Sequence, residues 1–168
     1  MGGEWRRRPY SSEILANLIY GPSYISLEYA LQLYGLIPER VCTVMSVTTG
    51  RSRRFSTPVG DFSYRKVSMP AFASGMDLLP NTSGGMYMVA VPEKALTDKI
   101  QSERGLSRRS GREIERYLLE NLRVDISALS QLTVKRIDKY AALYRSQKVA
   151  RLADFVRKLQ NKGKQKDR

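Results

Sequence analysis

Three arginines, Arg51, Arg53 and Arg54, fall within four residues of one another. They follow Thr49-Gly50, in a segment that predicts a turn between two strands. A guanidinium is planar, keeps its charge and donates paired hydrogen bonds to phosphate or carboxylate groups, so this turn could hold an anionic group. The same charges could instead only protect an exposed sheet edge against pairing with other chains. The sequence leaves both interpretations open.

A second set of chemically capable residues follows a strongly apolar segment. Glu93, Lys94 and Asp98, together with Asp61 or Asp77, could form the carboxylate–carboxylate–lysine set of a metal-dependent nuclease. A glutamate in this position also suits the first turn of a helix, where it complements the helix dipole. The helical explanation is the simpler one, and we expect neither a catalytic site nor a bound metal here.

The chain of 168 residues contains no histidine. This excludes a serine–histidine–aspartate or cysteine–histidine nucleophile and a histidine-ligated zinc ion. The sequence also contains no glycine-rich phosphate loop. Cys42 is the single cysteine, so no pair of closely spaced cysteines exists. We therefore expect a protein that binds rather than catalyses, without cofactor, in the reducing cytoplasm.

Positive charge is concentrated in the second half of the chain. The formal net charge is +13, of which residues 1–91 contribute +3 and residues 92–168 contribute +10. Such a distribution favours an acidic partner, either nucleic acid or an acidic protein surface, although it could serve solubility alone. The longest apolar run, residues 86–91, is too short to cross a membrane. The basic residues that we expect at a partner surface, besides the three arginines above, are Arg108, Arg109, Lys135, Arg136, Lys139, Lys148 and Arg151.

Hydrophobic periodicity predicts two helices near the N-terminus, residues 13–20 and 27–34, packed as a pair. Ser26 is placed to cap the second helix at its N-terminus. Gly35 is placed to end it in the left-handed conformation, with Leu36 folding back onto Leu31. The segment 1–11 is expected to be flexible and basic.

The pattern then changes to that of extended strands. Residues 41–48, 53–57 and 61–67 predict strands, the last two joined as a hairpin. Residues 86–91 are apolar at every position, which predicts a central strand covered on both faces.

Four helices are predicted after residue 91, the first over residues 92–103 and the others starting after Ser110, Thr133 and Ser146. The predicted fold class is α+β: an N-terminal helical pair, a short mixed sheet to about residue 91, and a basic helical bundle over residues 92–160. Residues 161–168 contain no apolar residue and are expected to be a disordered basic tail.

Four blocks, residues 24–31, 34–39, 44–55 and 91–96, resemble the AbiEi family in order and spacing. AbiEi proteins are the antitoxins of abortive-infection, type IV toxin–antitoxin systems, which act in phage defence. The family-like positions in these blocks are Ser26, Glu28, Gly35, Thr49, Gly50, Glu93 and Lys94.

The resemblance implies a non-catalytic antitoxin that counters a nucleotidyltransferase-like toxin encoded beside it. Family members typically begin with a DNA-binding winged helix, but only about ten residues precede the first family-like helix here. We therefore expect a single antitoxin domain over residues 12–160. The alternative is a nucleic-acid-binding protein or a transcriptional autoregulator of its own operon.

Overall fold

A computed structural model describes residues 11–107 and 110–166. Arg108, Arg109 and nearly all of the predicted flexible segment 1–11 therefore lie outside the described residues. Within them, eight α-helices, one π-helical turn and a six-stranded mixed sheet confirm the α+β class.

The sheet has the strand order β3-β4-β2-β1-β6-β5. Strands β1 and β6 run parallel, as do β2 and β4, and the other three neighbouring pairs are antiparallel. The strands are β1 (Ser23–Ile25), β2 (Val44–Thr48), β3 (Arg53–Thr57), β4 (Gly60–Lys66), β5 (Met76–Pro80) and β6 (Met86–Ala90).

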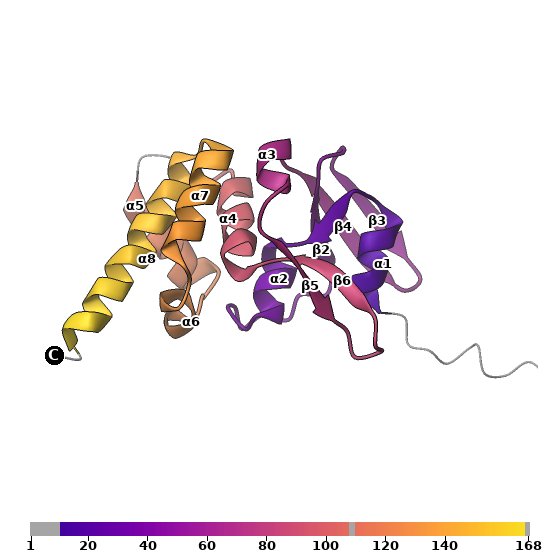
Figure 1. Cartoon of the computed structure of the whole chain (residues 1–168), viewed down its shortest axis with the longest axis horizontal. Coiled ribbons are helices and arrows are strands. Elements are labelled where there is room, and N and C mark those ends of the chain that lie inside the picture. The colour runs from indigo at the N-terminus through magenta and orange to yellow at the C-terminus, as the bar shows by residue number, and fades with distance from the viewer. Residues whose placement is uncertain (1–10, 108–109, 167–168) are drawn as a thin grey trace, which may run out of the picture.

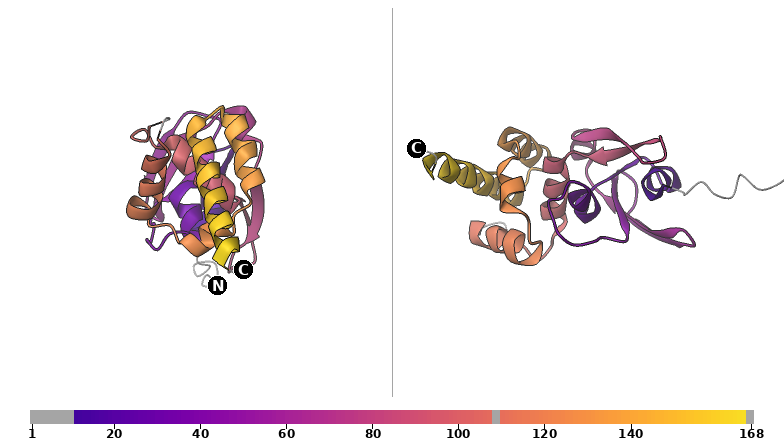
Figure 2. Two further views of the ribbon diagram at one scale, coloured as in Figure 1. Left: turned by 90° about the vertical axis from the view of Figure 1, so that its left-hand side faces the viewer. Right: turned by 90° about the horizontal axis from the view of Figure 1, so that it is seen from below.

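The helices surround this sheet unevenly. Helix α4 lies between the sheet and the C-terminal helices, and the last turns of α8 project beyond the body of the molecule (Figures 1 and 2). The helices are α1 (Ser12–Ile19), α2 (Leu27–Leu33), α3 (Met69–Phe72), α4 (Pro92–Ser102), α5 (Gly111–Arg116), the π-turn η1 (Tyr117–Asn121), α6 (Ile126–Ser130), α7 (Val134–Tyr144) and α8 (Gln147–Lys166).

The strand register defines two faces of the sheet. Tyr24 pairs with Val47, and Val47 pairs with Arg65, so these three side chains share one face, which we call the α4 face. The opposite face is covered by α1, where the Tyr64 hydroxyl donates a 2.6 Å hydrogen bond to the Ala16 carbonyl. One continuous apolar core fills both sides of the sheet and extends to α8.

The predicted N-terminal helical pair is not formed. Strand β1 lies between the two helices; α1 packs on β1, β2 and β6, whereas α2 packs on α4 and β2. A 2.6 Å hydrogen bond from Tyr29 to Glu13 connects the two helices. The three residues of β1 are too few to produce a periodic signal in the sequence, which is why the prediction missed the strand.

The predicted end of α2 is confirmed. Gly35 has φ +68°, and the Leu36 amide donates a 2.9 Å hydrogen bond to the Leu31 carbonyl, as in a Schellman ending. Ser26 occupies the N-cap position as predicted, but its hydroxyl makes no capping bond and is used elsewhere.

Two other expectations differ from the structure. Strand β6 is not a central strand covered on both faces: it is second from the sheet edge, with Met86 and Met88 exposed by 53% and 37%. In place of a disordered tail, helix α8 continues to Lys166. Within the described ranges, no helix is both long and apolar enough to cross a membrane.

Candidate anion-binding cleft

A cleft of about 820 Å³ opens between one end of the α4 face and the second half of α4. Its walls come from β2, the hairpin β3–β4 and the residues that follow α4. Four serines and two carboxylates, Glu28 and Asp98, contribute to the lining. The cationic lining residues are Arg53, Arg54, Arg65, Lys66, Lys99 and Arg104.

Both carboxylates of the cleft are neutralised by lysines. Glu28 lies 2.5 Å from the Lys99 ammonium, and Asp98 forms an ion pair with Lys94. The five remaining cations of the lining have no carboxylate of the described residues within ion-pair distance. The cleft therefore carries an uncompensated positive charge in a concave site, which attracts and concentrates anionic groups.

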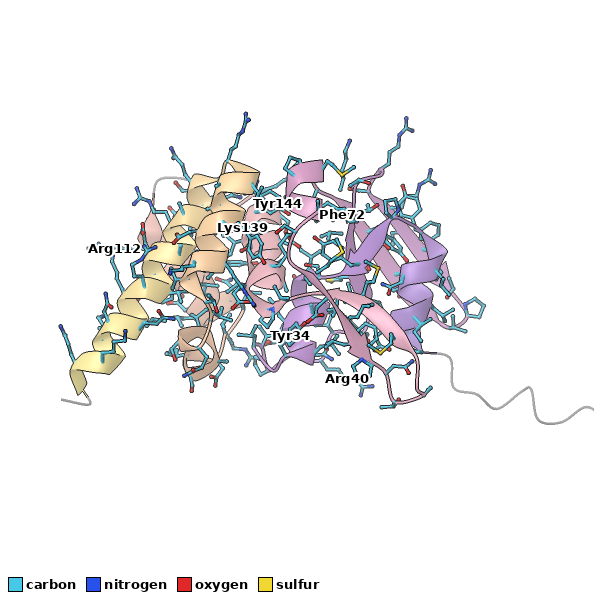
Figure 3. All side chains as sticks on the ribbon, viewed as in Figure 1. Tyr34, Arg40, Phe72, Arg112, Lys139 and Tyr144 are labelled. Carbon is cyan, nitrogen blue, oxygen red and sulfur yellow. The ribbon has the colours of Figure 1, made fainter. Side chains whose placement is uncertain are left out.

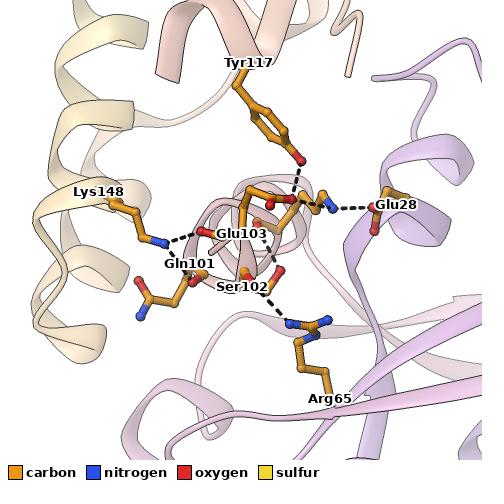
Figure 4. A network of polar contacts seen from close by, with 8 residues as sticks. Glu28, Arg65, Gln101, Ser102, Glu103, Tyr117 and Lys148 are labelled. Carbon is orange, nitrogen blue, oxygen red and sulfur yellow. Dashed lines mark hydrogen bonds and ion pairs between the residues drawn. The ribbon is translucent and has the colours of Figure 1, made fainter. Parts of the chain in front are cut away.

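Lys99 keeps its proton in this setting. Partial burial lowers the pKa of Lys99, but the hydrogen bond and the charge of Glu28 outweigh burial and raise its pKa above the ordinary value. Lys99 also lies 3.5 Å from Glu103, which accepts a 3.0 Å hydrogen bond from Tyr117. The α4 side of the cleft is therefore fixed by contacts to α2 and η1 (Figure 4).

Two basic side chains from different elements cap the C-terminus of α4 (Figure 4). Arg65 of β4 donates to the Ser102 carbonyl at 3.3 Å. Lys148 of α8 donates to the carbonyls of Gln101 and Glu103 at 3.2 and 2.6 Å. The last carbonyls of a helix lack partners within the helix and attract cations.

Lys148 therefore does not lie on an exposed partner surface, contrary to the expectation from the sequence. Its exposed fraction is 9%, and it faces α4. The helical period alone could not reveal this, because the sequence does not show which face of α8 meets another helix end.

Behind the cleft, buried polar side chains converge on Asp98. The Ser26 hydroxyl donates to Asp98 Oδ2 at 2.7 Å, and the Tyr144 hydroxyl donates to Oδ1 at 2.6 Å. The Lys94 ammonium lies between two aromatic rings, 5.5 Å from the Tyr24 centroid and 5.3 Å from the Tyr144 centroid. Figure 3 shows Tyr144 at the end of α7, where that helix approaches α3.

This cluster connects two parts of the molecule: the sheet half, residues 11–91, and the helical half, residues 92–166. Ser26 and Tyr24 belong to the sheet half, whereas Tyr144 belongs to the helical half, and Asp98 binds both. Burial lowers the pKa of Lys94, and the charge of Asp98 offsets part of that effect. Because the Lys94 side chain has no exposed surface, its ammonium cannot reach a ligand in the cleft.

The arginine-rich turn is only partly at the cleft. Arg53 and Arg54 border it, whereas Arg51 is exposed in the turn before β3 and does not contribute to the lining. The Arg53 guanidinium also lies over the Tyr20 ring, 5.7 Å from its centroid. Arg51 precedes β3, which begins at Arg53, so the strand does not position it at the cleft.

Three of the family-like positions make contacts between the sheet half and α4. Ser26 bonds to Asp98, Glu28 pairs with Lys99, and the Lys94 ammonium lies over the Tyr24 ring. Glu93 is buried and accepts a 2.8 Å hydrogen bond from the Thr133 amide at the start of α7. Gly50 packs so closely on Tyr20 that an added Cβ would lie 2.6 Å from the hydroxyl oxygen. Thr49 adjoins it in the same bend and makes no contact that defines a role.

The basic residues predicted on the helices lie away from the cleft. Lys135 and Lys139 are exposed on α7. Arg136 pairs with Glu93 at 3.4 Å, and Arg151 lies 3.7 Å from Asp154. None of these side chains contributes to the lining of the cleft.

Sequence reasoning missed four of the six cations of the cleft, namely Arg65, Lys66, Lys99 and Arg104. Each stands near the end of an element, where an exposed charge is ordinary. No local pattern connects them, because β4 and the end of α4 meet only through the tertiary fold.

The carboxylates that could have formed a nuclease site are kept apart. Glu93 and Asp98 are both buried and bonded to neighbouring side chains, and Asp61 and Asp77 are exposed on other elements. In the portion of the chain that is described, no three acidic or cysteine side chains converge as a metal site would require.

The sequence matches no known protein-family model and none of the curated proteins.

Proposed function

We propose that this protein is an antitoxin of the AbiEi type, acting in the cytoplasm by binding rather than by catalysis. Its partner is a nucleotidyltransferase-like toxin encoded beside it, and the cleft is the docking site for an anionic part of that partner. The observation that carries this proposal is a set of five cationic side chains around a concave surface that have no carboxylate partner among the described residues.

The cleft suits this role better than the basic surface of α7. Its unpaired cations come from β3, β4 and the segment that follows α4, and Arg65 is held in place by the Ser102 carbonyl. Charges held by a rigid framework lose less conformational entropy on binding than long side chains that move freely. Four lining hydroxyls add hydrogen-bond donors for carboxylate or phosphate oxygens.

The test is rescue of growth when the toxin is co-expressed with antitoxin variants. The triple variant Arg54→Ala/Lys66→Ala/Arg104→Ala removes three cations from the cleft and is expected to lose protection. The matched control Lys135→Ala/Lys139→Ala/Lys158→Ala removes the same charge from α7 and α8 and is expected to protect as the natural protein does. Full protection by the cleft variant, at equal protein level, would contradict the proposal.

A second candidate function is nucleic-acid binding, including repression of its own operon. The exposed Lys135 and Lys139, one helical turn apart on α7, favour it, because together they present a basic stripe outside the cleft. This function predicts binding to duplex DNA whose affinity falls steeply with salt, as counterion release requires. For this function the variant Lys135→Ala/Lys139→Ala/Lys158→Ala is expected to lose binding in an electrophoretic mobility-shift assay. The cleft variant is expected to keep it.

A further inference from the structure

The hairpin of β5 and β6 exposes an apolar surface at the opposite end of the α4 face. Leu78 pairs with Met88 and Pro80 pairs with Met86, so all four side chains point to the same side. Leu78, Met86 and Met88 are exposed by 54%, 53% and 37%. We call these four residues the hairpin face. Exposed apolar side chains gathered at one place on a protein surface mark interaction sites.

The hairpin face belongs to a part of the chain that is almost free of charge. Residues 67–91 contain a single charged residue, Asp77, although the whole chain has a net charge of +13. The α4 face thus has two exposed ends, the cationic cleft beside β3 and β4 and the uncharged hairpin face on β5 and β6. The two ends suit partners of different chemistry.

The hairpin offers a partner its side chains rather than a free strand edge. The Asn17 side-chain amide bonds both the amide and the carbonyl of Met88, at 2.6 and 3.2 Å, so these groups point away from β5. The backbone groups of the paired Leu78 therefore point outward, to the open edge. Its amide is already bonded to the Asp77 carboxylate at 2.8 Å, and Pro80 has no amide to donate.

We propose that the hairpin face is the contact through which a second copy of this chain docks. Two copies of a chain with a net charge of +13 repel each other at their cationic surfaces. The hairpin face is the exposed apolar surface through which two copies can meet without bringing cations together. A twofold axis through the hairpin would place the Leu78–Met88 pair of one copy on that of the other, with no cation of the hairpin between them.

Sedimentation velocity of the full chain, at several protein and salt concentrations, tests this proposal. We expect a dimer whose dissociation constant falls as salt rises, because salt screens the repulsion between two cationic copies. Leu78→Lys and Met88→Lys are each expected to raise that constant by about tenfold or more, since each buries an unpaired charge. The control Val59→Lys changes an exposed residue of the β3–β4 turn and is expected to leave it unchanged.

Three results would overturn the proposal: a monomer at every concentration, a dissociation constant that rises with salt, or an unchanged dimer in Met88→Lys. Circular dichroism establishes that each variant is folded. If a lysine variant does not fold, the milder Met86→Gln/Met88→Gln decides in its place, because it also removes the apolar contact and is expected to weaken the dimer.

Discussion

Ser26 of the sheet half and Asp98 of the helical half are joined by a buried 2.7 Å hydrogen bond across 72 residues of sequence. The serine stands where a helix cap would be expected, yet its hydroxyl donates to α4 instead of to its own helix. The bond fixes α4 against the end of β1, and α4 in turn forms one wall of the cleft. The shape of the proposed binding site therefore depends on a contact that lies behind it.

Replacing Ser26 by alanine is expected to lower the free energy of unfolding by about 1–3 kcal/mol, because one oxygen of a buried carboxylate loses its donor. Urea denaturation measures the change. The exposed Ser83→Ala is the matched control and is expected to stay within about 0.5 kcal/mol of the natural protein. An equal effect of both substitutions would show that the Ser26 contact contributes nothing specific.

Lys94→Met is expected to destabilise the protein by about 3–5 kcal/mol, because it leaves Asp98 buried without its cation. The double variant Lys94→Met/Asp98→Asn is expected to be less destabilised than the single one, since it removes both charges and keeps an acceptor oxygen for the buried hydroxyls. Chemical denaturation of the two variants gives the comparison. A double variant less stable than Lys94→Met would contradict the buried ion pair as the cause.

Lys148→Met tests the contact between α8 and the end of α4. It leaves the carbonyls of Gln101 and Glu103 without their donor and is expected to cost about 1–3 kcal/mol. Lys158→Met, exposed on the same helix, is expected to have almost no effect. Thermal unfolding followed by circular dichroism distinguishes the two, and similar melting temperatures for both variants would argue against the cap.

The protein is expected to lose stability as pH rises from about 10 to about 12. Burial raises the pKa of Tyr34, Tyr64 and Tyr117 to about 12, from an ordinary value of 10.0. Between these pH values the unfolded chain releases tyrosine protons that the folded protein retains. The stability is therefore fully present below about pH 10, and the free energy of unfolding falls progressively as the pH rises to about 12. Each such tyrosine contributes a slope of up to about 1.4 kcal/mol per pH unit.

Urea denaturation at several alkaline pH values measures this slope, and ultraviolet absorbance reports tyrosinate formation. Tyr64→Phe is the discriminating variant, because it removes one titrating group from a position that is 2% exposed. Its free energy of unfolding is expected to fall less steeply with pH than that of the natural protein. An unchanged slope would exclude Tyr64 as a contributor.

Local sequence patterns predicted those parts of the fold that local interactions dictate. The ending of α2 at Gly35 follows from the left-handed conformation that glycine adopts without strain. Helix α5 starts after Ser110 as predicted, because the Ser110 hydroxyl accepts a hydrogen bond from the Glu113 amide. The hairpin β3–β4 was predicted from its turn residues, and its first strand has the expected bounds. In each case the partners lie within a few residues of one another.

The candidate site was predictable only in its chemistry. Composition and the arginine-rich turn predict a cationic surface, but not that Arg54 would share a cleft with Arg65 and Arg104. Nor could they show that Lys148 would be buried at the end of α4. Both outcomes depend on which elements pack together.

The sequence by itself determined the excess of positive charge, the absence of histidine chemistry and the helices and strands whose signals are local. Only the tertiary structure decided which cations face the cleft and which are neutralised, because ion pairs such as Glu28–Lys99 join residues far apart in the chain. It also decided where the uncharged hairpin face lies. Charge is a property of residues, whereas the field that a partner meets is a property of their arrangement in space.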